Sequence, residues 1–170
     1  MPGWTAAFVV FADRLNRAFG RFAMYLLYVL MAVLLWSSLS KLGGQPSLWT
    51  LEMAQFVMVA YYVLGGAYTM QIGGHVRMDL FYARWSPGTK ALVDAFTMLA
   101  LIFYIGVMLW GAIESTVYSL TYAERSPTAW RPYLWPIKLV MCLGFVLMLL
   151  QATAEFLRDI ARLRGVDLPS

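Results

Sequence analysis

Long apolar runs, separated by single charged residues, dominate this chain. Three windows carry neither a charged residue nor a histidine: 22–40, 53–74 and 95–113, with 19, 22 and 19 residues. A helix needs about 20 apolar residues to cross the roughly 30 Å hydrocarbon core of a bilayer. Each window therefore predicts one membrane span.

A fourth window, Leu139–Ala154, is 16 residues long and covers only about 24 Å at a rise of 1.5 Å per residue. The apolar residues on either side lengthen it if Lys138 extends to the interface. The runs do not alternate between apolar and polar residues, as barrel strands do. We therefore predict an all-α membrane protein, a single domain over 1–170 with spans at about 22–40, 50–73, 92–113 and 134–157.

The N-terminal stretch predicts a further, amphipathic helix over 4–20. Its large apolar residues recur every three or four positions, which places them on one face, and we expect Asp13, Arg14 and Arg17 to lie away from it. Such a helix would lie in the membrane interface with its arginines toward anionic head groups; packing on a protein partner is the alternative. The apolar residues are Trp4, Phe8, Phe11, Leu15, Phe19 and Phe22.

The distribution of lysine and arginine predicts the orientation. Nine of them fall in the N-terminal segment, the loop between spans two and three, and the C-terminal tail, against four on the other side. Cytoplasmic segments are enriched in these residues, so both termini are predicted to be cytoplasmic. No positive charge precedes the first apolar stretch, which favours a retained span over a cleaved signal peptide.

Composition agrees with a membrane location. Hydrophobic residues make up 61% of the chain and charged residues 13%, whereas soluble domains average about 25% charged. The net charge is +4, but the basic residues lie at the ends of apolar runs and form no single patch. This pattern favours a membrane surface over nucleic acid as the partner.

Candidate chemistry is sparse. His75 is the only histidine and Cys142 the only cysteine, which excludes haem held between two histidines, histidine-rich or cysteine-based metal sites and an internal disulfide within this chain. We expect no cofactor and no enzyme activity, and an architectural role for His75. The span-end charges Glu52, Glu114 and Lys138 are all predicted near the outer interface, where Glu114 and Lys138 could pair or reach water separately.

Several motifs occur in a characteristic order. Trp49 and Glu52 open the second span, Gly65–Ala67 lie within it, and Gly-His-Val-Arg-Met-Asp (74–79) ends it. Glu-Arg-Ser-Pro (124–127) then precedes Trp-Pro (135–136) ahead of the last span. In this order the chain resembles the small permease subunit of the tripartite ATP-independent periplasmic (TRAP) transporters. It departs from that pattern at Gln55, where the family often has arginine, and at 141–142, where it often has proline.

The resemblance implies a scaffold with no catalytic role in the bacterial inner membrane. Its expected partners are membrane lipids, a large multi-span permease subunit that carries the sodium and substrate sites, and a periplasmic substrate-binding protein that delivers an organic acid. The candidates for structural or partner-interface roles are Trp49, Glu52, His75, Arg77, Asp79, Glu114, Trp135 and Lys138.

Other functions stay open at this point. The small subunit of a tripartite tricarboxylate carrier would share the same general features. A membrane anchor or redox subunit of another complex would show a cofactor absorbance, and the lone His75 argues against it. A self-assembled channel would conduct without any partner.

Overall fold

A computed structural model describes residues 3–44, 47–74 and 87–163. The described residues form four α-helices: α1 (Gly3–Leu42), α2 (Thr50–Gln71), α4 (Pro87–Thr121) and α5 (Trp135–Leu163). This confirms the all-α class for the described part of the chain. The predicted residues His75, Arg77 and Asp79 lie outside it.

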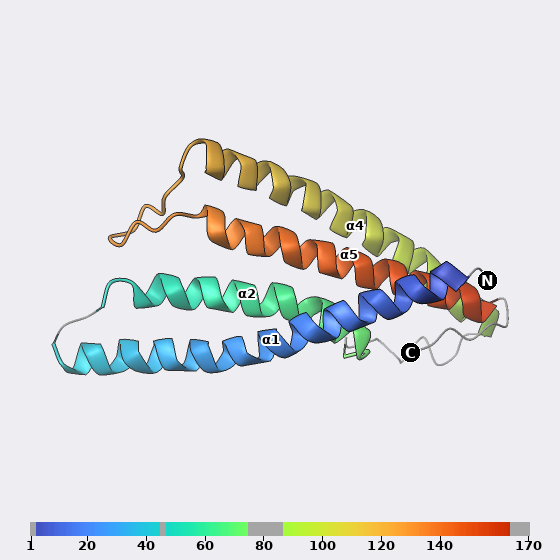
Figure 1. The fold of residues 1–170 in the computed structure, drawn as a ribbon, viewed down its shortest axis with the longest axis horizontal. Coiled ribbons are helices and arrows are strands. Elements are labelled where there is room, and N and C mark those ends of the chain that lie inside the picture. The colour runs from blue at the N-terminus through green and yellow to red at the C-terminus, as the bar shows by residue number, and fades with distance from the viewer. Residues whose placement is uncertain (1–2, 45–46, 75–86, 164–170) are drawn as a thin grey trace.

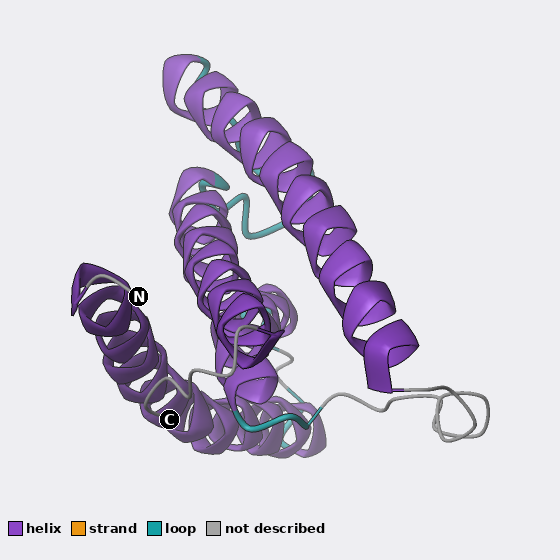
Figure 2. Cartoon of the chain, turned by 90° about the vertical axis from the view of Figure 1, so that its right-hand side faces the viewer, coloured by secondary structure: helices purple, strands orange, loops and turns teal. Residues whose placement is uncertain are grey.

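The helices form two antiparallel hairpins, α1–α2 and α4–α5, that lie side by side (Figure 1). α2 packs on α1 and α5, whereas α4 packs mainly on α5 and stands to one side of the other helices (Figure 2). We call the end with the connections 43–49 and 122–134 the loop end. The opposite end, where α1 begins and α5 ends, is the terminal end (Figure 1).

The first helix is unbroken over both the predicted amphipathic segment and the first predicted span. Its 40 residues measure about 60 Å at 1.5 Å per residue. Its buried face near the start consists of small and polar residues, Val9, Ala12, Asp13 and Asn16, whereas Phe11 is 59% exposed. Asp13 lies away from the predicted apolar face, and this is the packed side of α1, because small residues allow α1 to approach α5 closely and Arg158 of α5 forms an ion pair with Asp13 there.

Within the described ranges, three helical segments are long and apolar enough to cross a membrane: Trp4–Leu42, Phe96–Thr121 and Trp135–Ala161. They correspond to the first, third and fourth predicted spans. Glycine, tyrosine and glutamine residues lower the mean hydropathy of α2, which does not meet this criterion among the described residues. The second span therefore stays a prediction.

Glycines allow close approach at two helix contacts. A Cβ on Gly144 of α5 would lie 2.1 Å from Val63 Cγ1 of α2, and one on Gly20 of α1 would lie 2.4 Å from the Tyr68 ring of α2. Between these contacts Ala23, Leu64, Ala67 and Leu147 form a buried cluster. Such close packing of small residues joins membrane helices, because burial from lipid provides little hydrophobic driving force.

The α2–α5 contact predicts a sensitive position. Gly144→Ala should destabilise the fold by about 1–3 kcal/mol, because overpacking forces neighbours to shift. Adding Val63→Ala removes Val63 Cγ1, the atom that the new methyl group would overlap, and should restore part of the lost stability. Gly106→Ala is the matched control, since a Cβ there meets nothing within 4 Å. Unfolding in detergent, followed by circular dichroism, measures all four proteins; equal stability of the two single glycine variants would contradict the contact.

Candidate functional site

A polar cluster joins α1 to α5 near the terminal end of an otherwise apolar bundle. It consists of Asp13 and Asn16 of α1 with Gln151, Glu155 and Arg158 of α5. Arg158 forms ion pairs with Asp13 and, at 2.5 Å, with Glu155. Asn16 and Gln151 are fully buried. We call these five residues the terminal polar cluster.

The carboxylates fix the orientation of both amides. Gln151 Nε2 donates to Asp13 Oδ1 and to Glu155 Oε1, each at 3.2 Å. Because carboxylates only accept, the amide nitrogen must face them. Gln151 Oε1 then points toward Asn16, whose Nδ2 donates to it at 2.7 Å. The cluster therefore specifies one rotation of α1 relative to α5.

A second polar group lies between α4 and α5 at the loop end. Lys138 Nζ lies 2.7 Å from Glu124 Oε2 and 3.4 Å from the Ser115 carbonyl oxygen. Ser119 donates a hydrogen bond to the same Glu124 oxygen. Lys138 therefore pairs with Glu124, and of the two alternatives left open by the sequence, pairing of Lys138 with Glu114 is not the one observed.

Glu114 points away from Lys138, onto the exposed side of α4. Trp110, one turn earlier, donates its indole N–H to Glu114 Oε1 at 2.7 Å. Neighbouring positions on a helix differ by about 100°, so the carbonyl of Ser115 can lie near Lys138 while the Glu114 side chain cannot.

The pKa of Glu124 is lowered from its ordinary value of 4.5, chiefly by the hydrogen bond from Lys138 and then by that from Ser119. Glu124 lies in the connection between α4 and α5, where its side chain is 35% exposed. The carboxylate is thus held in its charged form beside its cation.

Hydroxyl groups close the α1–α2 connection. Thr50 Oγ1 donates to Ser37 Oγ at 3.1 Å and lies 3.0 Å from Ser47 Oγ, which in turn lies 3.1 Å from Ser40 Oγ. Thr50 is 1% exposed. These bonds tie the first residue of α2 to α1. Trp49, which precedes α2, provides no side-chain cap.

An apolar groove of about 530 Å³ opens between the two hairpins at the loop end. It lies on the loop-end side of the contact of Val63 with Gly144. α2 provides one wall, and the start of α5 with the preceding connection provides the other. The residues that line this loop-end groove are Leu26, Met53, Phe56, Val57, Ala60, Trp130, Pro132, Tyr133, Trp135, Pro136, Ile137 and Val140.

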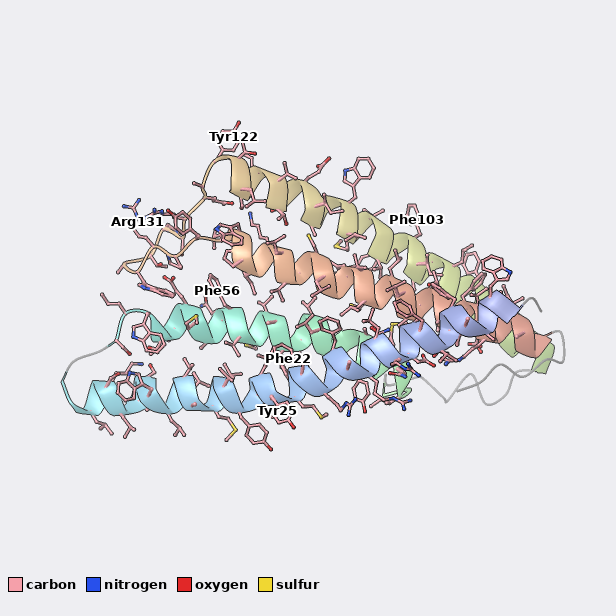
Figure 3. All side chains as sticks on the ribbon, viewed as in Figure 1. Phe22, Tyr25, Phe56, Phe103, Tyr122 and Arg131 are labelled. Carbon is pink, nitrogen blue, oxygen red and sulfur yellow. The ribbon has the colours of Figure 1, made fainter. Side chains whose placement is uncertain are left out.

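Figure 3 shows Phe56 on the side of α2 that faces the α5 hairpin, and Arg131 beyond the same end of the molecule. Glu52, in the first turn of α2, is 6% exposed, and its Oε2 has no hydrogen-bond partner among the described residues. Of the predicted candidates, Trp135 thus lines the groove, and Glu52 and Trp49 lie on the same turn of α2 that leads into it.

The described part of the chain contains no group of three or more His, Cys, Asp or Glu side chains that could hold a metal ion. Cys142 Sγ lies 3.3 Å from Thr116 Oγ1, between α5 and α4.

Comparison with known proteins decides the family. Residues 30–162 match the sequence model of the DctQ component of the tripartite ATP-independent periplasmic transporters. The chain belongs to the DctQ family. The predicted resemblance to the small permease subunit of the TRAP transporters is confirmed at the level of the family.

A curated relative agrees with this assignment. The chain is 24% identical over 119 residues to the isethionate TRAP transporter permease protein DctMQ of Oleidesulfovibrio alaskensis. The aligned part is 70% of this chain but 18% of the relative. The DctQ-family chain therefore spans less than a fifth of the length of that relative.

The sequence interpretation missed the terminal polar cluster. A signal was present: Gln151, Glu155 and Arg158 recur at spacings of four and three in an apolar helix, and Asp13 and Asn16 are three apart in α1. Such polar stripes on membrane helices face other protein, because lipid cannot satisfy them. The spacing alone does not say which helix provides the partner.

The terminal polar cluster predicts that loss of its cation alone destabilises the fold more than loss of the cation together with one carboxylate. Arg158→Leu leaves two carboxylates without their cation, and breaking a buried ion pair costs about 3–5 kcal/mol. The double variant Arg158→Leu/Asp13→Asn removes one of the stranded charges and should regain part of that loss. Unfolding titrations in detergent measure both.

Arg14→Leu is the control, because Arg14 is exposed and lies outside the cluster. If Arg158→Leu proved no less stable than this control, the ion pair would not hold α1 to α5.

Protonation of Glu124 should weaken the loop end. Because its folded-state pKa is lowered, the stabilisation is complete above the ordinary pKa of 4.5 and is lost as the pH falls below it. Thermal unfolding in detergent should show a drop between pH 7 and pH 3 that is smaller in Glu124→Gln. Glu114→Gln, at a side chain that accepts a hydrogen bond from Trp110, should keep the full drop. An unchanged drop in Glu124→Gln would contradict a stabilising role for the pair of Glu124 with Lys138.

Proposed function

We propose that this chain is the small permease subunit of a TRAP-type secondary transporter and acts as a scaffold for the large, multi-span permease subunit. The complex takes up an organic acid with sodium, after a periplasmic binding protein delivers it. The family match over residues 30–162 carries this proposal. The name of the relative, which joins DctM and DctQ in one permease protein, supports a large-subunit partner.

The exposed apolar surface supports a scaffold. Only 6% of the most apolar part of α4 is buried within the chain, against 28% for α5. Phe103 points outward from α4 and Tyr25 from α1 (Figure 3). A chain with two apolar flanks can cover another membrane protein on one flank and contact lipid on the other.

We assign the loop-end groove to the large subunit. Its walls are apolar, and tryptophan and tyrosine rings lie at its rim, the residue types that are enriched in the centres of protein interfaces. A transmembrane segment of the large subunit would cover the groove and shield the first turn of α2, including Glu52. Trp49, Glu114 and Lys138 then lie at the same end, as structural or contact residues.

The proposed orientation places this groove on the periplasmic side. The exposed arginines of α1 lie toward the terminal end, and the excess of basic residues predicts that end to be cytoplasmic. In the bacterial inner membrane both termini would then be cytoplasmic. His75, Arg77 and Asp79, which follow α2, would lie on the cytoplasmic side as contact or anchoring residues.

Filling the groove should weaken the complex. Ala60→Trp places a bulky side chain between its walls, so we expect several-fold less large subunit to co-purify with the tagged chain. Ala100→Trp is the matched control, because Ala100 is exposed on α4. Loss of the partner in Ala100→Trp alone would move the interface to α4.

Transport tests the role itself. Cells that lack this chain should lose uptake of the substrate, and re-expression of the wild-type chain should restore it. Uptake at the full rate without the chain would contradict a scaffold role. A cofactor absorbance in the purified protein, or conductance of the chain alone in liposomes, would instead support the redox or channel alternatives.

A further inference from the structure

A second groove lies between α1 and α2, on the side of the bundle nearer the terminal end. Its volume is about 400 Å³, and Gly20 and Met24 of α1 and Tyr62, Gly65 and Thr69 of α2 are among its lining residues. A Cβ on Gly65 would meet only the Ala23 Cβ, at 4.0 Å. Missing side chains therefore leave this space, which we call the glycine groove.

Two exposed arginines of α1 lie close in sequence to residues that line the glycine groove. Arg17 and Arg21 precede Met24 by seven and three residues, so the three share one face of α1. Long helical side chains lean toward the helix N-terminus, which directs both guanidinium groups toward the terminal end. The first charge-free window begins directly after them, at Phe22, so they mark where α1 leaves the hydrocarbon.

These cations have no counter-ion within the described part of the chain. Both arginines are exposed, and the ion pairs that join two described residues include neither of them. The nearest acidic residue of α1, Asp13, is turned inward to Arg158. Two adjacent positive charges are thus left beside an apolar groove.

We propose that the glycine groove and Arg17 with Arg21 form a binding site for one anionic phospholipid. The arginines bind the phosphate, and one acyl chain lies along the groove, past Gly65 toward Tyr62. The groove runs from Thr69 to Tyr62, about 10 Å along α2 at 1.5 Å per residue. A soluble anion would use only the charges and a neutral lipid only the groove, whereas an anionic phospholipid matches both.

Native mass spectrometry of the detergent-purified chain, alone and in complex with its large subunit, tests this site. The probes are dioleoyl phosphatidylglycerol, dioleoyl phosphatidylcholine and inorganic phosphate. We expect one phosphatidylglycerol to be retained in preference to phosphatidylcholine. Arg17→Gln/Arg21→Gln should weaken phosphatidylglycerol binding about thirtyfold, because each basic residue near an anionic lipid surface contributes roughly fivefold. Arg131→Gln, at the other end of the molecule, should leave it unchanged.

Gly65→Leu fills the groove and should reduce binding of both lipids, whereas Gly106→Leu on α4 is the matched control. If Gly65→Leu does not fold, the effect of Arg17→Gln/Arg21→Gln on phosphatidylglycerol binding still tests the proposal. Three outcomes would overturn the proposal: equal binding of the two lipids, displacement of the lipid by inorganic phosphate, or retention by the isolated chain but not by the complex. The last would assign the groove to a helix of the large subunit.

Discussion

The contact between α2 and α5 holds the two hairpins together. At Val63 and Gly144 the backbones approach so closely that a single added carbon atom would not fit. α1 is attached to the rest mainly through α2, and α4 mainly through α5. Since lipid competes with every apolar side chain for contact, such close packing must provide much of what joins helices in a membrane.

Polar groups complete the fold at its two ends and are nearly lacking between them. The terminal polar cluster joins the first and last helices, and the pair of Lys138 with Glu124 closes the α4–α5 hairpin. Each group fixes a helix rotation, because hydrogen bonds depend on direction and van der Waals packing does so only weakly. This division leaves the middle of the bundle apolar among the described residues.

The sequence predicted the helices well because each depends on its own residues. The charge-free window 22–40 lies within α1, and the predicted span 134–157 lies close to α5. Contacts between helices were predicted poorly, because they depend on helix rotation. Arg158 and Asp13 are 145 positions apart, and nothing in either local sequence names the other. The sequence offered Glu114 as a possible partner of Lys138, and only the direction in which Glu114 leaves α4 excludes it.

The close contact also determines how the loop-end groove can change its width. Packing of α2 on α5 extends from Val63 and Gly144 toward the terminal end, whereas the hairpins part beyond them. The two hairpins would therefore pivot about this contact. Met53, which lines the groove, lies ten residues from Val63, about 15 Å at 1.5 Å per residue. A pivot of about five degrees there would shift the rim by about 1.3 Å, roughly the length of a carbon–carbon bond. Small changes in packing at Val63 and Gly144 would therefore change the width of the loop-end groove and its fit to a bound partner.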